Sequence, residues 1–217
     1  SADVLCEVPG GLIRRPCDGQ EHIHGRWLLL EGEAAGKPLA LGVVNSGQHG
    51  LDILDGEARL SVLRSAAFCH EKGFPLEEGR AWRFMDQGIH EVRILVTAGA
   101  PEQVRAALPG LADFLDAPPT AYSHLPPGIA PPGSGDGLAG NAPRDGIEVL
   151  SLEPETMRLT ACKRSEDGRA LILRLQESAG RPARASLRVC GIPDRIDLPF
   201  RPLELKTLRI DRDGTCR

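Results

Sequence analysis

Histidines are the residues of this chain best suited to bind metal or to move protons near neutral pH. His22 and His24 lie two positions apart, so in a strand both imidazoles would share one face and could begin a metal site. With no third ligand nearby in the sequence, two exposed polar side chains on the solvated face of a strand are the favoured interpretation. For His90, next to Glu91 and near Asp86, a hydrogen bond within a loop is favoured over catalysis.

Glycines at positions 135, 137 and 140 match the spacing G-x-G-x-x-G of dinucleotide-binding loops. That motif needs a strand before it and a helix after it, whereas prolines precede this one and the sequence NAPRDG follows it. The chain also has no H-E-x-x-H helix, no G-x-S-x-G elbow and no P-loop lysine. A pair of glycosidase carboxylates cannot be recognised from spacing. The residues alone therefore predict no catalytic group and no metal site.

The run NSGQHG, residues 45–50, is a polar loop between two apolar runs, and it is longer than a tight connection requires. Shortly after it, Asp55 and Gly56 separate two strand-like runs. Aspartate and glycine tolerate the positive φ of a type I′ turn, so these residues predict a β-hairpin.

Short apolar or alternating runs bounded by Gly, Asp and Pro predict strands in the first half of the chain. They are residues 26–31, 39–44, 51–54, 58–63 and 89–96. Only residues 101–117 have helical spacing, and Pro109 is expected to kink or end that helix. Near the C-terminus, residues 171–175 and 184–189 alternate apolar and polar side chains, which is typical of half-buried antiparallel strands in a small sandwich.

Residues 117–146 are rich in proline and glycine and lack hydrophobic periodicity, which predicts a linker or long loop. It would separate a β-sandwich portion at residues 1–116 from a smaller one at 147–217. The chain is thus predicted to be all-β, with an antiparallel β-sandwich, a smaller C-terminal β-sandwich and at most one or two short helices.

The composition argues against several classes of partner. The net charge is -4, and arginines are scattered among acidic residues, so no basic stripe predicts nucleic-acid binding. No run approaches the roughly 20 apolar residues of a membrane span, and the first residues do not resemble a signal peptide. We expect a soluble, cytoplasmic protein. The six cysteines form no C-x-x-C pair and are interpreted as buried or incidental thiols, with a disulfide framework as the alternative.

Taken in order, several motifs resemble the C-terminal β region of glycoside hydrolase family 38, the α-mannosidases. They are CEVPGGLIRRP, HGRWLLLE, LALGVVNSGQHGLDILDGEARLSVLRS, DQGIHE, CKRSEDGRALILRLQESAG and PFRPLELKTLRI. Together they cover nearly all of the chain outside residues 117–146. The order and spacing of these motifs carry the resemblance, because none of them is decisive alone.

This resemblance implies a large antiparallel supersandwich of the galactose-mutarotase-like kind, followed by a smaller terminal sandwich. In the family, a preceding α/β domain carries the metal site, which holds zinc in many members, and the aspartate nucleophile of a retaining mechanism. No such domain is present in this sequence. The resemblance thus implies a non-catalytic region that needs no cofactor of its own, is inactive alone, and acts on an α-mannoside through the full-length enzyme. A large exposed apolar patch is expected where the catalytic domain would pack.

The resemblance also implies a role for the polar loop, which in the family faces the catalytic domain near the sugar pocket. The substrate-proximal residues would be Asn45, Ser46, Gln48 and His49. Ser46 stands where aspartate is usual, and Gly47 where some members carry arginine, so Gln48 and His49 are the remaining candidates for sugar contact. The alternative is a hydrogen-bonded turn that only packs on the catalytic domain, and it is favoured.

A different class of function is a stand-alone carbohydrate-binding β-sandwich. Such modules usually hold sugars by stacking on exposed aromatic rings, and Trp82 is the candidate for this role. A purely structural β domain is the third possibility, because a fold does not by itself set a function.

Overall fold

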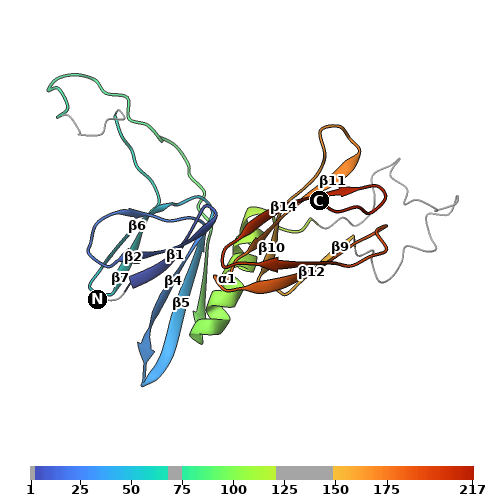
Figure 1. Cartoon of the computed structure of the whole chain (residues 1–217). Coiled ribbons are helices and arrows are strands. Elements are labelled where there is room, and N and C mark those ends of the chain that lie inside the picture. The colour runs from blue at the N-terminus through green and yellow to red at the C-terminus, as the bar shows by residue number, and fades with distance from the viewer. Residues whose placement is uncertain (1–2, 68–74, 121–148) are drawn as a thin grey trace, which may run out of the picture. The chain divides into compact units, whose positions relative to one another are not determined.

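The computed structural model describes residues 3–67, 75–120 and 149–217 (Figure 1). The chain divides into two compact units, Ser1–Pro118 and Pro119–Arg217. Both are built from antiparallel sheets, and α1 (Pro101–Asp116) is the one helix in the described residues. The all-β, sandwich-like fold predicted from the sequence is confirmed. Most of residues 117–146, including the glycine motif at 135–140, lies outside the described ranges.

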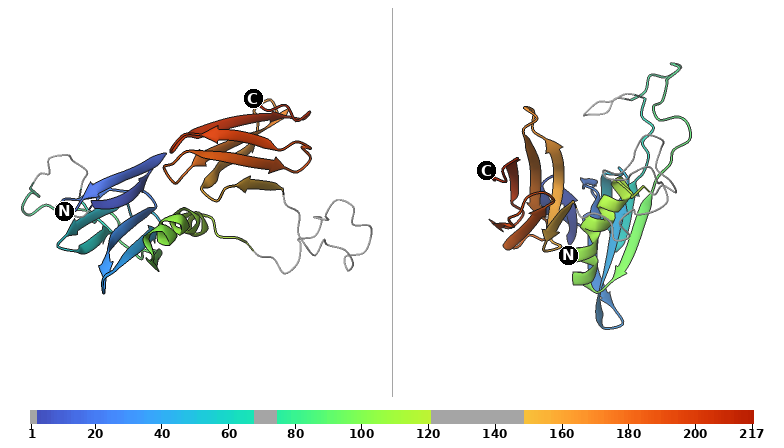
Figure 2. Two further views of the ribbon diagram at one scale, coloured as in Figure 1. Left: turned by 60° about the horizontal axis from the view of Figure 1, so that its bottom comes forward. Right: turned by 90° about the vertical axis from the view of Figure 1, so that its right-hand side faces the viewer.

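The main sheet of the first unit has five strands in the order β2-β1-β4-β5-β8. They are β2 (Gly11–Pro16), β1 (Asp3–Val8), β4 (Trp27–Ala34), β5 (Lys37–Asn45) and β8 (Ile94–Gly99). Helix α1 lies along one face of this sheet, mainly over β5 (Figure 2). The apolar positions of α1 meet Trp27, Leu29 and Val44 there, so this face is a buried core.

A smaller sheet packs on part of the opposite face. Its order is β3-β6-β7, with β3 (His22–Ile23), β6 (Gly50–Leu54) and β7 (Glu57–Ser61). Leu51 and Ile53 alternate with polar residues along β6 and pack on Val4, Cys6 and Leu28. These two sheets are the two layers of a sandwich.

Two tight turns connect the hairpins of this unit. Asp55 and Gly56 have φ values of 53° and 81° between β6 and β7, which confirms the predicted type I′ hairpin. Ala35 and Gly36 make a similar turn between β4 and β5, with φ values of 51° and 73°. Alanine rarely adopts positive φ, so the sequence does not signal that second turn.

Pro109 was expected to kink or end the helix, and the second of these is excluded, because α1 continues past Pro109 to Asp116. Leu108 on the buried face of α1 is fully enclosed by the sheet, and burial of that face stabilises the helix on both sides of the proline. The packing is close: a Cβ added to Gly42 of β5 would lie 2.7 Å from Cδ2 of Leu108.

The strand predicted at residues 89–96 lies later in the chain than expected, because β8 begins at Ile94 and ends at Gly99. Residues 75–93 contain no helix or strand and extend away from the sheets of their unit (Figure 1). Several of their apolar side chains are exposed, among them Phe84, Met85 and Ile89.

The second unit is a sandwich of two three-stranded sheets, ordered β10-β11-β14 and β13-β12-β9. The strands are β9 (Leu150–Glu153), β10 (Met157–Arg164), β11 (Ala170–Glu177), β12 (Ala183–Val189), β13 (Ile196–Phe200) and β14 (Leu205–Asp211). Leu173 and Leu175 of one sheet and Ala185 and Leu187 of the other are completely buried in the shared core. The predicted alternation at 171–175 and 184–189 is thus correct.

Among the described cysteines, Cys6, Cys162, Cys190 and Cys216 are free thiols. Cys6 is buried, but Cys162 and Cys190 are exposed, so the interpretation as buried residues holds only in part. Within the described residues, no helix is long and apolar enough to cross a membrane.

Candidate functional site

The polar loop predicted as substrate-proximal connects β5 to β6, and the structure brings its four candidate residues together. Asn45 is the last residue of β5 and is almost fully buried. Its side-chain oxygen Oδ1 accepts hydrogen bonds from the backbone N–H groups of Gly47 at 2.9 Å and Gln48 at 2.8 Å. This is an Asx-type turn, in which a side chain replaces backbone partners and fixes the start of the loop.

The amide nitrogen of Asn45 points the other way, toward the segment that precedes β4. Its Nδ2 lies 3.0 Å from the carbonyl oxygen of Gly25, 3.2 Å from that of Arg26 and 3.0 Å from Nε2 of His24. Both ends of this side chain are therefore used inside the protein. Asn45 positions the loop and is not free to contact a sugar.

His24 is buried, with 2% of its surface exposed. Its Nδ1 lies 3.0 Å from the carbonyl oxygen of His49, which also accepts the His24 backbone N–H at 2.9 Å. Burial lowers the pKa of His24 below the usual 6.5, against the opposing effect of its hydrogen bond to His49. The expectation of an exposed histidine on a solvated strand face is wrong for His24, because Asn45 and the loop cover it.

His22 and His90 have local partners. Nε2 of half-buried His22 lies 3.0 Å from a carboxylate oxygen of Asp18, and Nε2 of His90 lies 2.8 Å from the carbonyl oxygen of Asp86. The loop hydrogen bond favoured for His90 is confirmed. Within the described ranges, no three His, Cys, Asp or Glu residues gather in a group that could hold a metal ion.

Ser46 ties the loop to the residue before β8. Its backbone N–H donates to the carbonyl oxygen of Arg93, and its Oγ accepts the backbone N–H of Arg93, both at 3.1 Å. Gly47 has a φ of 128°, a conformation that side chains rarely adopt. Gln48 is half-buried and His49 is exposed. Both side chains also have internal contacts: Nδ1 of His49 lies 3.2 Å from the carbonyl oxygen of Gly25, and Oε1 of Gln48 accepts from Oγ of Ser46 at 3.5 Å.

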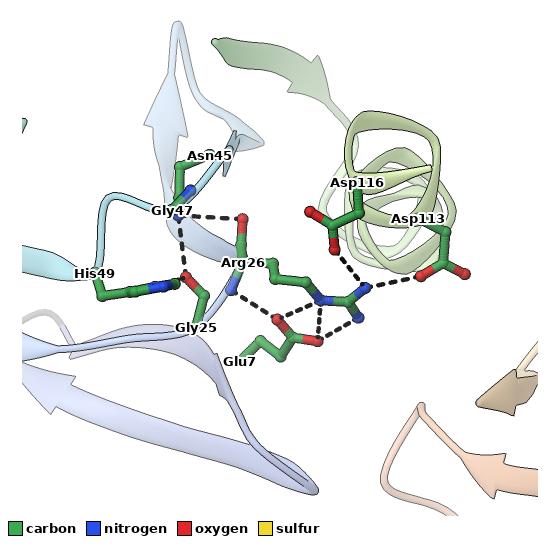
Figure 3. A network of polar contacts seen from close by, with 8 residues as sticks. All are labelled: Glu7, Gly25, Arg26, Asn45, Gly47, His49, Asp113 and Asp116. Atoms are coloured by element: carbon green, nitrogen blue, oxygen red, sulfur yellow. Dashed lines mark hydrogen bonds and ion pairs between the residues drawn. The ribbon is translucent and has the colours of Figure 1, made fainter. Parts of the chain in front are cut away.

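A charged cluster that sequence reasoning missed lies beside this loop (Figure 3). The guanidinium of Arg26 makes a two-point contact with the carboxylate of Glu7, at 2.6 Å from Nη2 and 3.0 Å from Nε. Its Nη1 donates to Asp113 at 2.9 Å and to Asp116 at 3.3 Å, both on the last turns of α1. These bonds, above all those to Glu7, raise the pKa of Arg26. Arg26 lies within the motif HGRWLLLE, but partners so distant in sequence leave no local signal.

Gly25 allows this cluster to close. A Cβ at position 25 would lie 2.9 Å from both the carbonyl oxygen and a carboxylate oxygen of Glu7. The backbone N–H of Gly25 donates to that same carbonyl oxygen at 2.6 Å. Only glycine fits between the strand that carries Glu7 and the loop that carries His49.

Trp82 lies in the segment 75–93, where its ring is partly buried. The Arg80 guanidinium carbon stands 4.3 Å from the ring centroid, a cation–π arrangement that occupies one face of the indole. Its Nε1 lies 3.5 Å from the carbonyl oxygen of Glu77. A stacking platform for sugar needs an open ring face, and Arg80 leaves at most the other face of the indole for this role. Sugar stacking by Trp82 remains a prediction.

Comparison with known proteins places this fold among glycoside hydrolases. The chain has a fold like that of part of family 38. One similar solved structure is an α-mannosidase from Enterococcus faecalis V583, and another is a protein in glycosyl hydrolase family 38 from Enterococcus faecalis. Each has a TM-score of 0.65, is 15% identical and covers 96% of this chain.

This chain spans about a quarter of those proteins, namely 24% of the first and 25% of the second. No family model matches the sequence, and no curated protein matches it. The likeness therefore concerns the fold, and activity is a separate question.

Proposed function

We propose that this chain is the non-catalytic C-terminal β region of an α-mannosidase-like glycoside hydrolase. The observation that carries the proposal is the shared fold over 96% of this chain with a quarter of an α-mannosidase. The ordered family-like motifs, from the Arg26 strand to the final β14 strand, support it independently of the fold. In this proposal, a catalytic domain not included in these residues holds the zinc ion and the nucleophile of a retaining mechanism.

An exposed apolar surface in the first unit supports the idea of a missing partner domain. Leu39 and Leu41 of β5 and Ile94 and Val96 of β8 are 37% to 64% exposed. Strand register puts them on the sheet face opposite α1, since Gly42 and Thr97, which alternate with them, lie against the helix. We call these four residues the β5–β8 patch. Adjacent exposed apolar side chains of this kind mark interaction sites more often than isolated ones do.

The substrate of the complete enzyme would be an α-mannoside, with the loop at residues 46–49 beside the sugar. Asn45 and Ser46 would shape the loop, because their polar atoms are bonded within the protein. Gln48 and His49 would contact a hydroxyl group in place of the longer internal contacts that they make with Ser46 and Gly25. In this assignment, Asn45 and Ser46 position the loop, and Gln48 and His49 contact the sugar.

The proposal can be tested with the β5–β8 patch in the polypeptide encoded by the whole reading frame. Replacing Leu41 or Val96 by Asp would put a charge into the interface, so we expect weaker hydrolysis of an α-mannoside and an earlier thermal unfolding of the catalytic domain. Ile23→Asp is a matched control, because Ile23 is 70% exposed and lies on β3 outside the patch. Patch variants as active and as stable as this control would contradict packing at this surface.

A further inference from the structure

We propose that His24 is the positioning residue of the loop at residues 46–49, and that it holds the loop in place only while its imidazole is neutral. The conformational part of this inference needs only the contacts of the first unit. Its consequence for mannoside binding rests on the proposed function. Neither the resemblance nor the motifs assign a role to His24.

The donors and acceptors around Asn45 allow one arrangement. Backbone N–H groups of Gly47 and Gln48 can only donate, so the atom they meet is the oxygen of the Asn45 amide. The amide nitrogen therefore faces the carbonyl oxygens of Gly25 and Arg26 as well as Nε2 of His24. Because this nitrogen donates and does not accept, Nε2 of His24 at 3.0 Å is unprotonated. The carbonyl oxygen of His49 can only accept, so the ring proton is on Nδ1. The contacts thus select the neutral Nδ1–H form.

In this form His24 holds both ends of the loop. At the start it accepts from Asn45, whose other end binds the next two backbone N–H groups. At the C-terminal end of the loop, the Nδ1–H and the backbone N–H of His24 both donate to the carbonyl oxygen of His49. The orientation of Gln48 and His49 therefore depends on the His24 ring, which also lies edge-to-face with the His49 ring at 6.4 Å between centroids.

A second proton on His24 would break this arrangement. Nε2–H would then point at the Nδ2 hydrogens of Asn45. The Asn45 amide would relieve this clash by rotating, and its oxygen would then lose the hydrogen bonds from the backbone N–H groups of Gly47 and Gln48. The titratable groups that act on the ring are Glu7 on β1, which favours the charged form, and His49, which disfavours it. Burial also disfavours the charged ring, so the neutral form prevails at neutral pH and the loop is released in acid.

The test uses amide NMR signals of the 217-residue chain between about pH 7.5 and about pH 4.5. In the native chain, the Gly47 and Gln48 N–H signals should shift and lose exchange protection as His24 titrates. His24→Gln supplies an acceptor near the position of Nε2 and cannot titrate, so the loop should stay ordered across the range. His24→Phe keeps the bulk of the ring without an acceptor, so the loop should be loosened at every pH.

His22→Gln is the matched control, because His22 lies two residues away and bonds to Asp18 and not to the loop. It should keep the native pH response. A pH response that survives in His24→Gln would assign the transition to another group, such as His49, and would overturn the proposal. Loop amides that stay protected in His24→Phe would overturn it as well.

Kinetics of the polypeptide encoded by the whole reading frame then address the sugar. His24→Phe should raise KM for an α-mannoside by about threefold to tenfold with kcat little changed, as expected for loss of a binding contact. His24→Gln should recover most of that affinity. An unchanged KM for His24→Phe, together with a loosened loop, would contradict the link to substrate. An enzyme without any mannosidase activity would instead refute the proposed function and leave the loop measurements standing.

Discussion

Arg26 and Asp113 are 87 positions apart in the chain, yet Nη1 of the arginine donates to Oδ1 of the aspartate at 2.9 Å. Asp113 and Asp116 lie at the C-terminal end of α1, where the helix dipole disfavours negative charge and where α1 has no basic residue in its last turn. Arg26 compensates both carboxylates and also pairs with Glu7 on β1. One side chain therefore joins the end of the helix to the sheet beside the candidate loop.

Removing this arginine should destabilise the first unit. Arg26→Met keeps the apolar stem but removes the cation that the three carboxylates share, so we expect the free energy of unfolding to fall by about 1–3 kcal/mol. Fluorescence-detected urea unfolding reports this unit, because both tryptophans lie in it. Arg59→Met removes more exposed ion pairs, with Asp52 and Glu57, and should change stability much less. Equal effects of the two substitutions would contradict a special role for Arg26.

Close packing between β5 and α1 makes a second prediction. A Cβ at position 42 would lie 2.7 Å from Leu108 Cδ2 and 2.9 Å from Val104 Cγ1, so Gly42→Ala should destabilise by about 1–3 kcal/mol. Gly32→Ala on β4 meets no atom within 4 Å and should be neutral or slightly stabilising. Thermal unfolding compares the two variants. A neutral Gly42→Ala would mean that α1 lies farther from β5.

Glu177 is expected to be a structural carboxylate in the second unit. It is completely buried, and its oxygens accept backbone N–H groups from Ala179, Gly180, Arg181 and Leu203 at 2.8 to 3.2 Å. Glu177→Gln would put amide hydrogens against these donors and should cost about 2 kcal/mol or more. Hydrogen exchange of β11 should then accelerate, whereas exposed Glu166→Gln should leave it unchanged. Unaltered exchange in Glu177→Gln would argue against this role.

Cysteine reactivity should follow burial. Burial raises the pKa of Cys6 to about 11, so at about pH 8 its thiol is neutral as well as covered. Cys162 and Cys190 are exposed. Brief treatment of the folded chain with iodoacetamide, followed by peptide mass spectrometry, should show both exposed cysteines modified and Cys6 unmodified. Denaturant should abolish the difference. Modification of Cys6 as fast as Cys190 in the folded chain would contradict the buried position.

The sequence predicted those features that depend on neighbouring residues. Alternation along residues 171–175 and the Asp55–Gly56 turn are local patterns, and both are correct. The helical spacing of residues 101–117 was also a correct local signal, and α1 continues through Pro109 because the tertiary packing of Leu108 outweighs the local preference of proline.

The candidate site was harder to predict. The polar loop was found from its composition. The hydrogen bonds that hold it, however, include one to His24, which is 21 positions before Asn45 and was expected to be exposed. Arg26 likewise meets partners far along the chain. Contacts between distant segments leave no periodic pattern in a single sequence, so the residues that fix the loop could not be recognised before the fold was known.

The central claim is that this chain supports a catalytic site located elsewhere. Its most direct test is hydrolysis of a chromogenic α-mannoside by the 217-residue chain, with and without added zinc, beside the polypeptide encoded by the whole reading frame. The account predicts turnover by the latter and none by the 217-residue chain under either condition. Turnover by the 217-residue chain alone would show a catalytic site within these residues and would contradict the account.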